Sequence, residues 1–115
     1  MPFFPTSLKG VTVFEPAVYN DERGHFFESY NEKQFNDAGI DAKFVQDNQS
    51  FSKHGVLRGL HYQLAPFAQA KLVRVLHGEI FDAAVDIRKG SPDYGKWTGV
   101  ILSAANKKQM FIPRG

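Results

Sequence analysis

The amino-acid sequence predicts a single all-β domain of antiparallel strands with one short helix. Short runs rich in β-branched and aromatic residues are separated by turn signals, and only one stretch has the features of a helix. Helices do not alternate with the strands, which favours a sandwich or barrel over a doubly wound α/β fold. The length of 115 residues, with 11 Phe, 4 Tyr and 1 Trp, suits one aromatic core across residues 1–115.

The N-terminal part of the chain is expected to contain two strands and the helix. Residues 11–15 form the first strand, which a proline ends. An Asp-Glu-Arg-Gly turn at 21–24 leads into a second strand at 25–30, which has aromatic side chains on both faces. Residues 31–38 then form the helix, because an Asn at its start can cap the first turn and a Gly after its end can stop it.

The remainder of the chain is expected to form six more strands, most of them separated by Gly or Pro. They cover residues 43–52, 56–63, 71–77, 79–88, 96–103 and 108–113. Side chains alternate along a strand, so Phe81, Ala83 and Val85 share one mostly apolar face of the strand at 79–88. The opposite face carries Asp82, Ala84 and Asp86.

Charge and composition exclude several classes of protein. Fourteen Lys and Arg against twelve Asp and Glu leave a formal charge of +2, so no nucleic-acid partner is expected. The absence of Cys excludes disulfides, thiolate catalysis and Cys-ligated metals. With no apolar run of membrane-spanning length and no leader pattern at the N terminus, we expect a soluble, cytoplasmic protein without a membrane partner.

His61 is the first candidate for chemistry, because an imidazole exchanges protons near neutral pH. A structural or solvent-facing role is the alternative. In a straight strand Arg58 and His61 would point to opposite faces, so one pocket holds both side chains only if Gly59 marks a bulge or bend. A barrel with polar groups on its inward face would enclose a ligand pocket around His61, and polar faces turned toward water are the alternative.

Cationic side chains are candidates for binding anions. Lys71 opens the strand after the one that holds His61, and its ammonium could stabilise an oxyanion in a dry cavity. Arg23, Arg58 and Arg74 could each bind phosphate oxygens through the guanidinium group. For each of them an ordinary surface position is the alternative.

The spacing around His61 also bears on metal binding. Jelly-roll barrels of the cupin type often bind a metal through Gly, five residues, His, one residue and His, followed by Glu. Gly55 and His61 keep that spacing, but Gln63 replaces the second His. The position expected for the Glu is occupied by Phe67 or Ala68. Amide and apolar side chains are poor ligands, so we expect a cupin-type scaffold that works without a metal.

Five blocks of the sequence resemble the dTDP-4-dehydrorhamnose 3,5-epimerase family, in family order and at family spacing. They are DERGHFFE at 21–28, FVQDNQS at 44–50, GVLRGLHYQ at 55–63, KLVRV at 71–75 and VDIRKGSP at 85–92. The resemblance implies a cupin-type jelly roll, a homodimer, and inversion of carbons 3 and 5 of dTDP-4-dehydro-6-deoxy-D-glucose without a metal or organic cofactor. It places the reaction in the bacterial pathway to dTDP-L-rhamnose, a precursor of lipopolysaccharide and other cell-surface polysaccharide.

The resemblance also implies roles for individual residues. His61 matches the base, and Lys71 matches the residue that stabilises the enolate oxygen. The substrate-binding positions are Arg23, Phe26, Glu28, Gln46, Asn48, Arg58 and Lys71. Strand parity puts Asp82 near this cluster, where we expect it to position Lys71 or His61, with an exposed carboxylate as the alternative.

The chain departs from the family at its C-terminal end. The family continues for about another third, with the tyrosine that acts as the opposing acid and the aspartate that orients the imidazole. None of Tyr19, Tyr30, Tyr62 and Tyr94 matches that tyrosine. We therefore expect a C-terminally incomplete domain, either a portion of a longer enzyme or a truncated product. Because unpaired strand edges aggregate, the 115-residue polypeptide alone is expected to be poorly soluble and inactive.

Two other classes of function stay open. One is a sister enzyme that epimerises a single carbon of a dTDP-sugar, or a 3,4-ketoisomerase that uses the same base and scaffold. The other is a non-catalytic cupin module that only binds a sugar nucleotide. Product analysis separates the enzymes from one another, and the loss of turnover when His61 is replaced separates an enzyme from a binding module.

Overall fold

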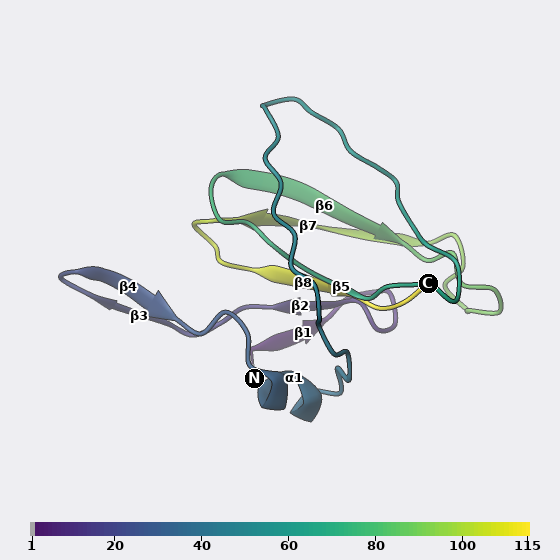
Figure 1. Ribbon diagram of the computed structural model, residues 1–115, viewed down its shortest axis with the longest axis horizontal. Coiled ribbons are helices and arrows are strands. Elements are labelled where there is room, and N and C mark those ends of the chain that lie inside the picture. Colours follow the sequence, from purple (N-terminus) through teal and green to yellow (C-terminus); the bar gives the residue numbers. More distant parts are fainter. Residues whose placement is uncertain (1) are drawn as a thin grey trace.

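The structure is a computed structural model that describes residues 2–115. Its centre is a four-stranded sheet in the order β1-β2-β8-β5 (Figure 1). These strands are β1 Phe3–Pro5, β2 Thr12–Phe14, β5 Lys71–Arg74 and β8 Gln109–Ile112. Two smaller sheets are hairpins, formed by β3 Val18–Asp21 with β4 Gly24–Phe27 and by β6 Glu79–Val85 with β7 Trp97–Ser103.

The predicted fold class is confirmed, because across residues 2–115 every strand pair is antiparallel and one short helix, α1 Glu32–Asp37, accompanies the strands. The expected cap is present, since the Asn31 side chain accepts a hydrogen bond from Gln34 N at 3.0 Å. Gly39 follows the helix with a φ of 88°, a conformation that favours glycine. Within residues 2–115, no helix is long and apolar enough to cross a membrane.

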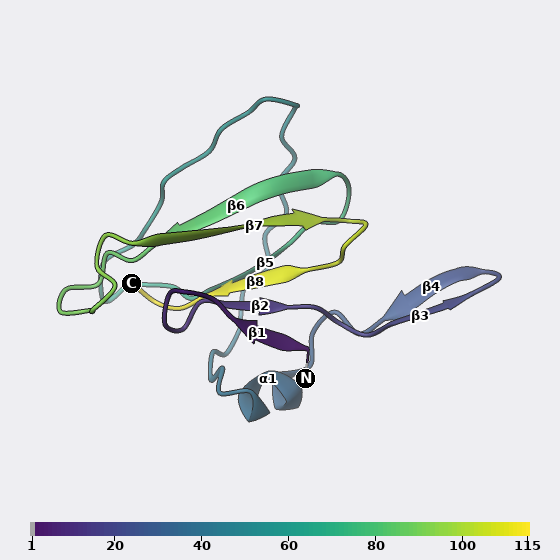
Figure 2. The same ribbon diagram turned by 180° about the vertical axis from the view of Figure 1, so that it is seen from behind.

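Both faces of the central sheet are covered by apolar side chains. The β6–β7 hairpin closes one face over a core of Leu8, Val11, Ala84, Leu102 and Met110. The other face packs Phe14, Phe35, Ile40 and Phe111, and Phe35 is the buried residue of α1. Figure 2 shows the resulting order of layers, with the hairpin on one side of the sheet and the helix on the other.

The β6–β7 hairpin turns its more polar side inward. Ala84 and Asp86 are buried, whereas Phe81 on the opposite, mostly apolar side is 63% exposed. Phe81 lies over Gly99 of β7, where an added Cβ would come within 2.3 Å of its ring. The inward side places Asp82 in the space between the hairpin and the central sheet, where a carboxylate can act on other groups.

The long connection between α1 and β5, residues 41–70, contains no strand. The strands predicted at 43–52 and 56–63 are therefore wrong for this structure. The physical reason is that a strand needs a neighbour to accept and donate its backbone hydrogen bonds, and within residues 2–115 no strand pairs with this segment. The connection rises beyond β6 in Figure 1, with Val45, Phe51 and Leu57 more than four-fifths exposed.

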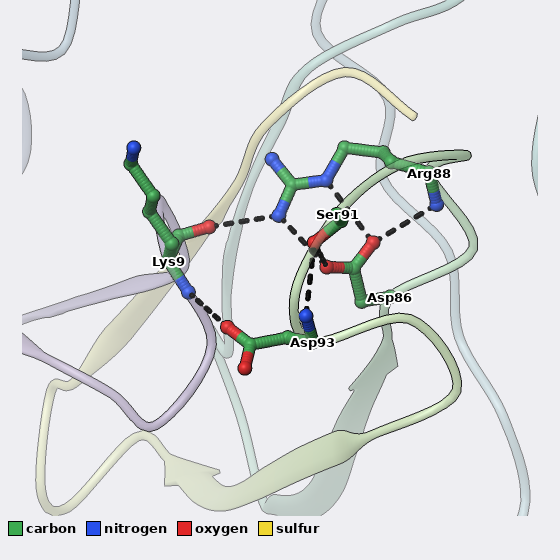
Figure 3. A network of polar contacts seen from close by, with 5 residues as sticks. All are labelled: Lys9, Asp86, Arg88, Ser91 and Asp93. Carbon is green, nitrogen blue, oxygen red and sulfur yellow. Dashed lines mark hydrogen bonds and ion pairs between the residues drawn. The ribbon is translucent and has the colours of Figure 1, made fainter.

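A polar clasp formed by Lys9, Asp86, Arg88, Ser91 and Asp93 joins the loop after β6 to the loop after β1 (Figure 3). The carboxylate of Asp86 accepts hydrogen bonds from Arg88 N at 2.9 Å, from Arg88 Nε and Nη2 at 3.1 Å, and from Ser91 Oγ at 2.5 Å. Arg88 Nη2 also donates to the Lys9 carbonyl at 3.0 Å, and Lys9 N lies 3.5 Å from Asp93 Oδ2. Two loops far apart in the sequence are thus held together.

The clasp depends on a charged carboxylate. The Arg88 guanidinium, followed by the Ser91 hydroxyl, holds the pKa of Asp86 well below its ordinary range. A carboxyl group whose pKa is lowered by folding stabilises the folded state above its unfolded pKa, and that contribution is lost as the pH falls through the lowered value. The clasp is therefore intact at neutral pH and weakens only in strong acid.

Candidate active site

Lys71 and Asp82 enter the same space from two different layers. Lys71 opens β5 on the same face as Val73, which packs into the core beneath the β6–β7 hairpin. Asp82 lies in β6 on the face of Ala84, which belongs to that same core. The charge of Lys71 therefore acts on Asp82, although Lys71 itself is exposed and no ion pair joins the two side chains among residues 2–115.

Asp82 has an unusual environment for a carboxylate. Its Oδ2 atom is buried and has no hydrogen-bond partner among residues 2–115. Burial raises the pKa of Asp82, and the Ala83 N–H together with the charge of Lys71 counteracts part of that rise. A buried acceptor without a partner is available to a donor, either the Lys71 ammonium or a hydroxyl of a bound molecule.

His61 is exposed on the long connection, between Leu60 and Tyr62, which are 76% and 64% exposed. Residues 2–115 therefore do not enclose the pocket that strand parity predicted around it. Gly59 has a φ of 127°, which favours glycine and interrupts the extended run. In a straight strand Arg58 and His61 would point to opposite faces, so one site could hold both side chains only where the strand is interrupted. The backbone conformation of Gly59 is consistent with that requirement.

Other polar side chains of the connection form hydrogen bonds with nearby residues of the same connection. Gln46 Nε2 donates to Asn48 Oδ1 at 3.2 Å, so the two amides lie on one side of an extended segment. Arg58 donates from Nε to Ser52 Oγ at 2.7 Å and from Nη2 to the Phe51 carbonyl at 3.2 Å. The Arg58 guanidinium is therefore held by residues of the same connection, six and seven positions earlier.

The β3–β4 hairpin carries the other predicted binding residues and projects from the body in both Figure 1 and Figure 2. Arg23 lies in its turn with a side chain that is 90% exposed, and donates to Asp21 Oδ2 at 2.8 Å. This hydrogen bond lowers the pKa of Asp21. Phe26 in β4 is 71% exposed, and Glu28 follows the strand.

The predicted site residues thus form three groups. They are Lys71 with Asp82 between the layers, the side chains Gln46, Asn48, Arg58 and His61 on the connection, and Arg23, Phe26 and Glu28 on the hairpin. Within residues 2–115, no hydrogen bond or ion pair joins one group to another. In the same part of the chain, no three His, Asp or Glu side chains gather to hold a metal ion.

Sequence reasoning missed one buried polar residue that connects the hairpin group to the central sheet. Gln109 in β8 is 1% exposed and donates from Nε2 to the Ser29 carbonyl at 2.9 Å. The available signal was a glutamine directly before the apolar residues of the strand predicted at 108–113. Its partner could not be inferred, because it lies 80 residues away.

Comparison with known proteins gives a consistent result. A family model described as dTDP-4-dehydrorhamnose 3,5-epimerase matches residues 5–115. A dTDP-4-dehydrorhamnose 3,5-epimerase from Shigella flexneri is 60% identical over 116 residues, which cover 100% of this chain and 64% of that protein. One from Methanothermobacter thermautotrophicus is 57% identical over 98% of this chain and 60% of its own length.

Solved structures show the same similarity in three dimensions. A dTDP-6-deoxy-D-glucose-3,5-epimerase from Legionella pneumophila, in complex with dTDP-4-keto-L-rhamnose, superposes with a TM-score of 0.92 at 53% identity, covering 98% of this chain and 60% of that one. A 3'-monoepimerase from Streptomyces bikiniensis, in complex with dTDP-quinovose, gives 0.89 at 35% identity, covering 96% and 57%. The chain spans less than two thirds of the length of these relatives.

Proposed function

The chain belongs to the dTDP-4-dehydrorhamnose 3,5-epimerase family, and from that membership we propose that the complete gene product inverts carbons 3 and 5 of dTDP-4-dehydro-6-deoxy-D-glucose. The observation that carries this proposal is 60% identity across the whole chain to an enzyme of that name. The product would be dTDP-4-dehydro-L-rhamnose, an intermediate on the way to dTDP-L-rhamnose. The enzyme is then an isomerase in a pathway that serves cell-surface polysaccharide.

The chemistry of the substrate requires the residue types that the chain carries. A hydrogen beside a ketone is acidic because its removal leaves an enolate, so the reaction needs a base and a cation near the keto oxygen. We assign the base to His61 and the cation to Lys71. In a site from which the bound substrate excludes water, an ammonium stabilises an oxyanion far more strongly than it would in water. An acid on the opposite ring face completes each inversion.

Substrate binding is assigned to the hairpin and the long connection. The guanidinium groups of Arg23 and Arg58 match the geometry of diphosphate oxygens. Glu28, Gln46 and Asn48 supply hydrogen-bonding groups for the nucleoside and sugar, and Phe26 offers an exposed ring for packing. For these residues to act on one substrate, the connection and a β3–β4 hairpin must come together beside Lys71 in the complete gene product.

Asp82 is proposed to position the Lys71 ammonium, and the variant Asp82→Asn tests this. A hydrogen bond to a charged group contributes roughly 1.5–3 kcal/mol, so kcat should fall roughly 10-fold to 100-fold. Burial raises the pKa of Asp82, so the wild-type carboxylate takes up a proton on the acid side of the kcat profile. The variant carries no titrating group at position 82, so its kcat should lose this part of the acid-side pH dependence.

The matched control for this experiment is Glu79→Gln, the same type of change at an exposed position of β6. It should leave both kcat and its acid-side pH dependence as they are in the wild type. An Asp82→Asn variant with wild-type kcat and an unchanged acid-side pH dependence would show that Asp82 does not act on Lys71.

The proposed reaction is tested by following solvent deuterium into the sugar. In deuterated water, NMR of the product made by the complete gene product should show label at both carbon 3 and carbon 5. Label is expected because each inversion removes a carbon-bound proton and returns one from solvent. Turnover of the dTDP-sugar without label at either carbon would contradict the proposal.

A single epimerisation is the second candidate, and the similarity to a 3'-monoepimerase favours it. Label at carbon 3 alone would assign the chain to that activity. Migration of the keto group would indicate a 3,4-ketoisomerase, and binding of the sugar nucleotide without any turnover would indicate a binding module.

We further propose that the complete gene product is a homodimer that acts in the cytoplasm, without a metal, an organic cofactor, a nucleic acid or a membrane partner. Exposed aromatic side chains on the β3–β4 hairpin, Tyr19 at 68% and Phe26 at 71%, support a subunit contact there. Sedimentation measures the oligomeric state directly, and retention of activity after chelation tests independence from metal.

A further inference from the structure

Gln109 occupies a central position in the four-stranded sheet. It lies in β8, opposite Phe14 of β2 on one side and Arg74 of β5 on the other. The residue is 1% exposed, and its Oε1 atom is buried without a hydrogen-bond partner among residues 2–115. Burying an amide among aromatic rings is unfavourable unless it is hydrogen-bonded, so its one side-chain bond, to the Ser29 carbonyl, is structurally important.

Ser29 belongs to the short link between β4 and α1. It directly follows Glu28, and β4 ends only two residues before it, at Phe27. The next residue, Tyr30, packs its ring 4.9 Å from that of Phe35 and 5.5 Å from that of Phe44. The link is therefore anchored to the core at two adjacent positions, one polar and one aromatic.

The rest of the β3–β4 hairpin lies away from the body of the protein (Figure 1). Its direction depends on where the chain is held at its two ends. Gln109 holds one of those ends, immediately beside a proposed substrate-binding residue. We propose that Gln109 is a positioning residue that sets the hairpin, and with it Glu28 and Arg23, in the orientation that binds the nucleotide sugar. This inference depends on the proposed function.

Because the hairpin is long, a small rotation at its anchor, Ser29, moves its turn by a large distance. Arg23 lies six positions before Ser29 in the chain. At about 3.3 Å per residue of strand, the turn lies about 20 Å from the anchor. A tilt of about 10° at the base would move the Arg23 guanidinium by about 3–4 Å, more than a hydrogen bond to a phosphate oxygen tolerates.

The variant Gln109→Met in the complete gene product tests the proposal, because methionine has a similar length and no donor. The KM for the dTDP-sugar should rise roughly 3-fold to 10-fold, the range that one neutral hydrogen bond supplies, while kcat stays within about twofold. Hydrogen exchange should become faster in residues 18–30 and stay unchanged in β2 and β8. Gln69→Met, at an exposed glutamine, is the matched control and should leave all of these as in the wild type.

Three results would overturn the inference. The first is a lower kcat with an unchanged KM, and the second is unchanged hydrogen exchange in residues 18–30. The exchange measurement needs no turnover, so it separates failure of the anchor from failure of the proposed reaction. The third result is measured on the wild type, so it does not depend on whether the variant folds. If the side-chain amide protons of Gln109 exchange at the rate of a free glutamine, the hydrogen bond to Ser29 is absent.

Discussion

Replacing His61 with Ala in the complete gene product is expected to lower kcat by roughly 10²-fold to 10⁴-fold, the range that a well-placed general base supplies. The affinity for dTDP should change little, because the imidazole is assigned to proton transfer and not to binding of the nucleotide. Initial rates by NMR and calorimetric titration with dTDP measure the two quantities separately. Loss of deuterium incorporation should parallel the loss of kcat.

The control is His54→Ala, the same substitution on the same connection seven residues earlier. It should retain the kcat of the wild type. A His61→Ala variant with more than about a tenth of wild-type kcat would contradict the assignment of the base. The expectation that the 115-residue polypeptide alone is inactive stays a prediction, and the exposed position of His61 in this structure supports it.

Replacing Phe35 with Ala is expected to lower the free energy of unfolding by about 3–5 kcal/mol. Phe35 is 1% exposed, and its ring lies 4.9 Å from Phe14, 5.0 Å from Phe3 and 4.9 Å from Tyr30. Its removal leaves a cavity between α1 and the central sheet that the surrounding rings can fill only in part. Urea unfolding of the complete gene product, followed by tryptophan fluorescence, measures the loss.

The graded control is Phe35→Leu, which keeps most of the volume and should lose about 1–2 kcal/mol. An alanine variant within about 0.5 kcal/mol of the wild type would behave like a surface substitution. That result would show that the helix does not cover the sheet in the way the ring contacts indicate.

Local signals predicted the helix and most of the strands well. Asn31 caps α1 and Gly39 follows it, and the strands predicted at 79–88, 96–103 and 108–113 contain β6, β7 and β8. These features depend on capping, turn residues and alternation, which involve neighbours in the chain. The short strands β1 and β3 were not predicted, because β1 contains two aromatic residues followed by Pro5 and β3 ends in two turn-forming residues.

For the candidate site, the resemblance assigned roles to His61, Lys71 and the binding positions, and these assignments stay predictions. Parity correctly put Asp82 on the face opposite Phe81. Parity could not show which of those faces points inward, because both carry apolar and polar residues. It also could not show that the segment around His61 lies exposed, since that depends on whether another strand pairs with it.

Composition, turn chemistry and the five ordered blocks were enough to determine an antiparallel β fold with one capped helix and membership of an epimerase family. Only the tertiary structure decided that Asp82 faces the layer holding Lys71, that Asp86 closes a clasp with Lys9, and that Gln109 reaches Ser29. The physical reason is the sequence separation over which each kind of interaction acts. Caps and alternation act between residues close in sequence, whereas these contacts form only after sheets have packed and distant loops have met.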